Sequence, residues 1–184
     1  MIYICIPTTP ERRARTQELI SSIYTHTKDI PYSIVVYENN DGGWVKAVHN
    51  MIENIHGTVW LIGSDCVLKN NAVKILNDTY KMVGGVIEPY NELHGDKLCQ
   101  HPFGDSELIK KYLDKRFTHW YSDNYFTILA NRENKLHYEP KAIIEHKHFI
   151  NGKAENDKTY ETIFNPETVE KDRQLFIKLT QQVI

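Results

Sequence analysis

The sequence of 184 residues lacks several features that would place it in particular protein classes. It has three cysteines, Cys5, Cys66 and Cys99, and no CxxC pair, which argues against a disulfide framework and indicates reduced thiols. The formal net charge of −2 provides no general attraction for nucleic acid. The apolar start IYICIP is too short for a signal peptide or a membrane span. We therefore expect one soluble, cytoplasmic domain over residues 1–184, of undetermined oligomeric state.

Three common glycine-centred motifs are also absent from the sequence. No GxGxxG follows the first apolar run, no Walker lysine loop is present, and there is no GxSxG nucleophile elbow. A phosphate-bearing ligand would therefore not be held by a glycine-rich helix start. The remaining physical solution is a divalent cation that carboxylate oxygen holds and that neutralises the phosphate charge.

Apolar runs of strand length alternate with helical patterns in the first half of the chain. The pattern predicts strands over residues 2–6, 33–38 and 58–62, and helices over residues 11–25, 44–55 and 73–80. Strands that alternate with helices in this way are typical of a parallel sheet covered by helices.

The second half is less regular. We expect strands at GGVIEPY and KAIIEH, and helices near residues 108–113, from residue 122, and over residues 169–183. Residues 149–166 are polar and contain Gly152 and Pro166, so they are predicted to form a mobile loop.

Asp65 is the carboxylate that first suggests a binding site. It follows the buried strand TVWLI, just as Glu38 ends the second strand and Thr8 and Thr9 follow the first. In open α/β sheets, ligands bind at the carboxyl ends of the strands, so these side chains should meet at one edge. The alternative is that Asp65 merely caps the next helix.

Over most of its length, the sequence resembles the family-two glycosyltransferases with the GT-A fold. The resemblance lies in ICIPTTPERRARTQELISSIYTHT, VVYENNDGG, VWLIGSDCVLKNNAVKIL and RFTHWYSDNYFTILANRENKLHYEPKAIIEH, and the tail resembles small phage-encoded members. It implies a GT-A-type fold with a mostly parallel central sheet flanked by helices. Residues 1–83 would bind the nucleotide sugar, residues 84–150 the acceptor and the catalytic base, and residues 151–184 would form a mobile loop and a C-terminal helix.

The resemblance implies a metal-dependent glycosyltransferase. It would move a sugar from a nucleotide-diphosphate donor, with a UDP-sugar favoured, to an unknown acceptor hydroxyl with inversion. The expected cofactor is Mn²⁺ or Mg²⁺, and the acceptor a glycan, a protein or a modified DNA base. The sequence departs from the family in two places. The motif Ser64-Asp65-Cys66 has one carboxylate where the family usually has two or three, and Glu38 replaces the usual Asp at the end of the second strand. A GT-A-like nucleotidyltransferase and a noncatalytic nucleotide-sugar or glycan-binding module are the alternatives.

The family pattern also assigns roles to individual residues. Asp123 would be the general base that takes the acceptor proton, with Asp105 or Glu88 as the next candidates. Trp120 and Tyr121 would contact the acceptor, although aromatic residues beside a helix start are more often core. The donor would be held by Thr8, Thr9, Arg12, Glu38, Asn40, Ser64, Asp65 and Lys153.

Histidines near the last strand complete the predicted site. Asp65, His146 and His148 are the predicted metal ligands, since imidazole can complete an oxygen-rich Mn²⁺ site. Lys153, Asp157 and Tyr160 lie in the loop that would close over the donor. A zinc site of Cys99, His101, His146 and His148 is a separate possibility, but its spacing fits no standard finger or ribbon.

Overall fold

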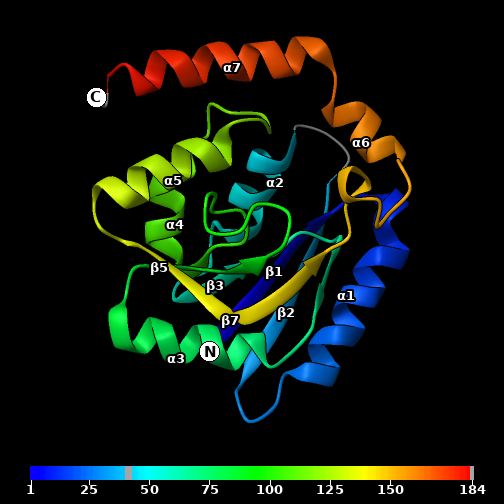
Figure 1. Ribbon diagram of the computed structural model, residues 1–184, viewed down its shortest axis with the longest axis vertical. Coiled ribbons are helices and arrows are strands. Elements are labelled where there is room, and N and C mark those ends of the chain that lie inside the picture. Colours follow the sequence, from blue (N-terminus) through cyan, green and yellow to red (C-terminus); the bar gives the residue numbers. More distant parts are fainter. Residues whose placement is uncertain (40–42, 183–184) are drawn as a thin grey trace.

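The computed structural model describes residues 1–39 and 43–182. Its centre is a seven-stranded sheet in the order β2-β1-β3-β6-β5-β7-β4, and helices cover both faces (Figure 1). Across the described residues, no helix is both long and apolar enough to span a membrane.

The N-terminal elements agree closely with the predicted alternation. β1 (Ile2–Thr8) pairs in parallel with β2 (Tyr32–Glu38) on one side and with β3 (Thr58–Leu61) on the other. The 3-10 turn η1 (Pro10–Arg12) leads into α1 (Arg13–His26), and α2 (Gly43–Ile52) connects β2 to β3. The carboxyl ends of β1 and β2 therefore lie side by side.

The rest of the chain adds further strands and helices to this unit. They are β4 (Cys66–Leu68), α3 (Ala72–Val83), β5 (Val86–Asn91), β6 (Phe103–Asp105), α4 (Ser106–Tyr112), α5 (Ser122–Arg132), β7 (Leu136–His146), η2 (Phe149–Asn151), α6 (Lys158–Ile163) and α7 (Pro166–Thr180). β5 and β7 are parallel, whereas β6 is antiparallel to both β3 and β5, and β4 is antiparallel to β7, so the sheet is mixed. The sequence pattern did not reveal the short strands β4 and β6.

The core consists of two apolar layers, one on each face of the sheet. Side chains of a strand point alternately to the two faces. Along β1, Ile2, Ile4 and Ile6 accordingly pack with α1 and α3, whereas Cys5 packs with residues of α2, α4, α5 and α7. This arrangement fixes the strand ends between two covered faces and leaves the carboxyl edge open for a site.

The segment over residues 149–166, predicted as a mobile loop, has regular secondary structure. The segment contains η2 and the helix α6, and α6 lies beside the start of α1 (Figure 1). Asp157 caps α6, since its side chain accepts a hydrogen bond of 3.0 Å from the Tyr160 amide. A polar composition can therefore hide a short helix when one face of that helix contacts a polar site.

Candidate functional site

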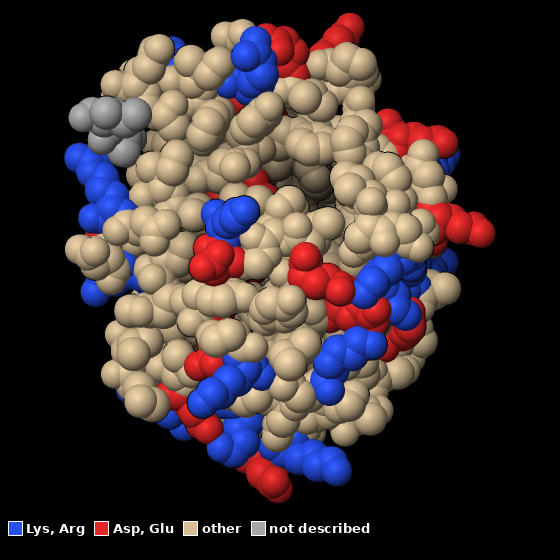
Figure 2. Space-filling view, in the orientation of Figure 1, with Lys and Arg blue, Asp and Glu red and all other residues tan. Residues whose placement is uncertain are grey.

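A cavity of about 340 Å³ opens at the carboxyl ends of β1 and β2. Its lining combines strand-end residues with residues of α2 and α6: Pro7, Thr8, Thr9, Arg12, Asn39, Trp44, Ser64, His119, Thr159 and Ile163. Figure 2 shows a hollow on this face, in the region of α2 and α6. The volume is at the lower end of the range of about 300–1,000 Å³ that is usual for small-molecule sites.

A second cavity of about 270 Å³ lies on the other side of Ser64. Its lining is charged and includes Arg15, Asp65, Lys147 and Lys153. Ser64 contributes to both cavities, so a ligand that reaches past Ser64 would contact both.

Asp65 is buried between the two halves of this site, with 6% of its surface exposed. Its Oδ2 accepts hydrogen bonds from the Arg12 guanidinium at 3.1 Å and from the Tyr160 hydroxyl at 2.8 Å. Its Oδ1 lies 3.4 Å from His146 Nε2. Burial alone would raise the pKa of Asp65, but the contacts with His146, Arg12 and Tyr160 outweigh it and hold that pKa well below its usual range.

Arg12 connects Asp65 to the C-terminal part of the chain. Its guanidinium also pairs with Asp157 at 3.2 Å and lies 4.1 Å from the centre of the Tyr160 ring. Arg15 pairs with the same Asp157 carboxylate at 2.9 Å. Thr9 adds a hydrogen bond of 2.8 Å to Thr159. The segment predicted to close over a donor is thus held directly against the strand-end site.

The residues around Asp65 do not fit the Mn²⁺ or Mg²⁺ site that was predicted. Such ions take several oxygen ligands, yet both Asp65 oxygens are engaged by Arg12, Tyr160 and His146. His148 is also not directed to Asp65 as a ligand, because its Nδ1 accepts a hydrogen bond of 3.2 Å from the Ile150 amide. Its ring packs on Phe149 and Tyr160.

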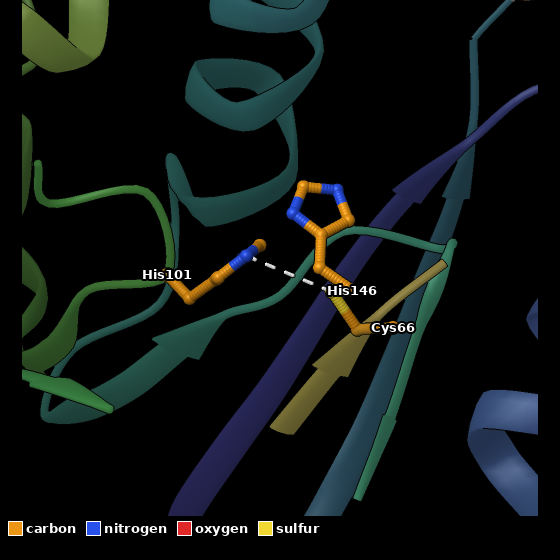
Figure 3. A group of neighbouring side chains, drawn as sticks. All are labelled: Cys66, His101 and His146. Atoms are coloured by element: carbon orange, nitrogen blue, oxygen red, sulfur yellow. Dashed lines mark hydrogen bonds between the residues drawn. The ribbon is translucent and has the colours of Figure 1, made fainter. Parts of the chain in front are cut away.

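A different group of metal-binding side chains lies beside Asp65. Among the residues that the structure describes, Cys66, His101 and His146 bring one ligand atom each to within 4.8 Å of one another (Figure 3). Cys99 does not join them, because its thiol points to Glu88 at 3.4 Å. The set of four considered from the sequence thus shares only His101 and His146 with this group.

The other predicted donor residues divide into two groups. Thr8 and Thr9 line the larger cavity, where the Thr8 hydroxyl lies 2.7 Å from that of Thr16. Glu38 instead pairs on the surface with Arg13 at 2.8 Å. Lys153 pairs with Glu145 at 3.0 Å and also with Glu92. Asn40 lies outside the described residues.

Asp123 lies in the first turn of α5, half-buried. Its Oδ2 faces the Gln100 side-chain amide at 3.4 Å, and its Oδ1 accepts from the Asn124 amide at 2.8 Å. Burial raises the pKa of Asp123, and no cation pairs with its carboxylate among the described residues. These are properties that a general base needs, so its role stays a prediction.

The two alternative bases have other partners. Glu88 is 2% exposed and accepts a hydrogen bond of 2.9 Å from the His101 amide. Burial raises the pKa of Glu88 to about 8. Asp105 caps α4 by accepting from the Glu107 amide at 2.9 Å.

Trp120 and Tyr121 serve packing in this structure. The Trp120 indole donates to the Ile163 carbonyl and packs edge-on against Phe164, with ring centres 4.7 Å apart. The Tyr121 ring stacks on Phe176 of α7 at 5.3 Å. The prediction that these rings bind the acceptor is therefore not supported, because α6 and α7 already occupy them.

His119 and Asp172 are among the residues of the site that were not predicted from the sequence. Asp172 is fully buried in α7, and its carboxylate accepts from the backbone amides of Thr118, His119 and Trp120. His119 lines the larger cavity, and burial lowers its pKa to about 4, so the ring is neutral. A signal existed for Asp172, since it lies three residues after Val169, on the apolar stripe of the last helix.

Comparisons with known proteins give structural matches only. No family model matches the chain, and no curated protein matches it. The S. aureus TarS 1–349 crystal structure in complex with UDP-GlcNAc has a TM-score of 0.71 and 15% identity, over 96% of this chain and 65% of that one. S. aureus TarS gives a TM-score of 0.63 and 15% identity, over 78% of this chain and 36% of that one.

A further structure matches the chain with a lower TM-score. A Bacillus anthracis protein described as a glucose-1-phosphate thymidylyltransferase gives a TM-score of 0.54 and 7% identity, over 88% of this chain and 99% of that one. The chain thus spans about a third of the length of the TarS structure, and all these identities are too low to carry over an activity. What the matches establish is the architecture: the chain has the fold of the GT-A-like nucleotide-sugar transferases.

Proposed function

We propose that the protein is a glycosyltransferase that takes its sugar from a nucleotide-diphosphate donor, with a UDP-sugar favoured. One observation carries this proposal: the cavity at the ends of β1 and β2 adjoins the buried Arg12–Asp65 pair, at the edge where sheets of this kind bind ligands. The matched TarS structure in complex with UDP-GlcNAc supports the choice of donor class.

The nucleoside would occupy the larger cavity, between the end of β1 and Trp44 of α2. The diphosphate would then face Arg12 and Arg15, which are both paired with Asp157 in this structure. A diphosphate competes with that carboxylate for the same two guanidinium groups. Donor binding would accordingly loosen the Asp157 end of α6.

The proposed chemical step forms one bond and breaks another. The acceptor oxygen attacks the anomeric carbon, the bond from that carbon to the phosphate oxygen breaks, and the nucleoside diphosphate leaves with the electron pair. Asp123 would take the acceptor proton, because its carboxylate is half-buried and lacks a paired cation among the described residues.

A nucleotidyltransferase is the second candidate. The observation that favours it is the match to the Bacillus anthracis protein over 99% of that chain. Against it, the segment TTPERRART after β1 holds arginines but no glycine, so it lacks the usual loop of that class.

The decisive experiment compares two reactions in parallel. A glycosyltransferase releases nucleoside diphosphate from a UDP-sugar, whereas a nucleotidyltransferase releases pyrophosphate from a nucleoside triphosphate and a sugar 1-phosphate. Calorimetry with UDP-GlcNAc should also show that Arg15→Gln weakens binding by about 10–100-fold, the scale of losing one charge-assisted contact.

Arg13→Gln is the matched control. It lies on the same helix but pairs with Glu38 at the surface, so UDP-GlcNAc binding should be unchanged. Pyrophosphate release without diphosphate release would favour the second candidate. The absence of binding to UDP-, GDP- and dTDP-sugars would refute both enzyme assignments.

A further inference from the structure

The cluster of Cys66, His101 and His146 follows from the strand register. Cys66 of β4 and His146 of β7 are directly opposed in an antiparallel pair, which places both side chains on the same face. His101 precedes β6, and its backbone is held on both sides: its amide donates to Glu88 at 2.9 Å, and its carbonyl accepts from the Trp60 indole at 3.0 Å. Figure 3 shows the three side chains converging from separate elements.

One polar atom of this buried cluster lacks a hydrogen-bond partner among the described residues. Cys66, His101 and His146 are 1%, 4% and 7% exposed. His146 Nδ1 has no hydrogen-bond partner among the described residues, although it is buried. In Figure 3, a nitrogen of this ring faces the side on which His101 lies. A buried nitrogen without a partner calls for an explanation, and an ion is one that its surroundings allow.

The contact with Asp65 prepares His146 for metal binding. Because Nε2 faces the Asp65 carboxylate at 3.4 Å, the ring proton is favoured on Nε2 and the lone pair on Nδ1. In metalloproteins, a histidine commonly donates the N–H of one ring nitrogen to a carboxylate and binds the metal through the other ring nitrogen.

His101 and Cys66 already have the spacing that a tetrahedral ion requires. With a metal–sulfur bond of about 2.3 Å and a metal–nitrogen bond of about 2.05 Å at a tetrahedral angle, sulfur and nitrogen would lie about 3.6 Å apart. The observed distance from Cys66 Sγ to His101 Nε2 is 3.6 Å. To bind an ion through Nε2, His101 has to carry its ring proton on Nδ1. That proton would replace the hydrogen bond that Nδ1 accepts from the Gly63 amide, which is long at 3.4 Å and therefore weak.

We propose that Cys66, His101 and His146 form a binding site for a borderline-soft divalent ion of the Zn²⁺ type, with Asp65 as the carboxylate that orients His146. One thiolate and two imidazoles suit Zn²⁺ and its neighbours in the first transition row, whereas Mg²⁺ and Ca²⁺ require oxygen. On binding, the S–H bond of Cys66 breaks, a sulfur–metal bond forms and the proton passes to solvent. Three protein ligands leave a fourth position open.

This proposal does not depend on the proposed sugar transfer, because it is tested without donor or acceptor. The protein is stripped with a chelator and dialysed against Zn²⁺ or Co²⁺, and its metal content is measured. One equivalent of Zn²⁺ is expected, and the Co²⁺ form should show an intense sulfur-to-metal charge-transfer band, which reports the Cys66 ligand directly.

The variants separate the site from adventitious binding. Cys66→Ser should abolish the charge-transfer band, and His101→Gln should weaken Zn²⁺ binding by more than the ~10–100-fold that loss of an outer-shell partner costs. Cys99→Ser is the matched control, since that thiol is equally buried but contacts Glu88 outside the cluster. Wild-type protein that binds no Zn²⁺, or a cobalt spectrum that Cys66→Ser leaves unchanged, would overturn the proposal whether or not His101→Gln folds.

Discussion

Replacement of Arg12 by glutamine provides the sharpest test of how the candidate site is held together. The Arg12 and Asp65 side chains are only 10% and 7% exposed and lie 3.1 Å apart. Removal of one partner of such a buried pair typically costs about 3–5 kcal/mol, because the other charge is left without compensation. Against the usual total of about 5–15 kcal/mol, Arg12→Gln should remove a large part of the stability.

The expected shift is large enough for a simple measurement. In a chain of this length, about 1 kcal/mol corresponds to about 2–4 °C in Tm, so Arg12→Gln should lower Tm by about 6–20 °C. Arg13→Gln is the control: the Arg13 side chain is 73% exposed, and its pair with Glu38 is open to solvent, so Tm should barely change. Equal Tm values for the two variants would show that Asp65 does not depend on Arg12.

The pH dependence follows from the lowered pKa of Asp65. A carboxyl whose pKa is lower in the folded state stabilises the fold fully above its unfolded pKa of about 3.9, and this contribution is lost as pH falls through the folded pKa. Arg12→Gln brings the folded pKa closer to the unfolded one. The difference in the free energy of unfolding between wild type and Arg12→Gln should therefore be constant above about pH 5 and shrink below about pH 4.

Three further predictions concern catalysis, the position of α6 and the effect of donor on it. Asp123→Asn should lower turnover by about 10²–10⁴-fold with little change in donor affinity, and Asp78→Asn on the surface of α3 serves as the control. Near-normal turnover in Asp123→Asn would place the base elsewhere, with Asp105 and Glu88 as the next candidates. Tyr160→Phe removes the hydroxyl that contacts Asp65 but keeps the ring, so amide exchange in α6 should accelerate by about 10–100-fold, whereas the exposed Tyr24→Phe should have no effect. Because a diphosphate would compete with Asp157 for Arg12 and Arg15, UDP-GlcNAc should accelerate amide exchange at the start of α6. Slower exchange over residues 149–165 with UDP-GlcNAc would instead support a segment that closes over the donor, and identical exchange in both states would refute both ideas.

The alternation of buried strands and amphipathic helices made the N-terminal half predictable. Apolar runs such as residues 2–6 and 33–38 have the length and composition of strands, and the stripe on α2 has a clear helical period. The two three-residue strands β4 and β6 were not predicted, because so short a segment has no measurable period and is fixed by its partners.

The strand ends that carry Thr8, Thr9 and Asp65 were predicted to meet, because parallel strands end at the same edge, and these residues line the two cavities that share Ser64. Glu38 was predicted with them but pairs with Arg13 at the surface instead. The partners of Asp65 were not predicted, since Tyr160 is 95 residues away and its approach depends on how α6 docks. The position of Cys66 opposite His146 likewise requires the antiparallel register of β4 and β7, which no local pattern in either segment encodes.

The buried carboxylate of Asp172 has a consequence for how a distant helix can act on the candidate site. It holds the amides of His119 and Trp120, directly before the helix that presents Asp123. Because these backbone amides share one carboxylate, a displacement of α7 at residue 172 has to move the turn before α5 as well. A molecule that displaces α7 would therefore shift Asp123 without contacting it.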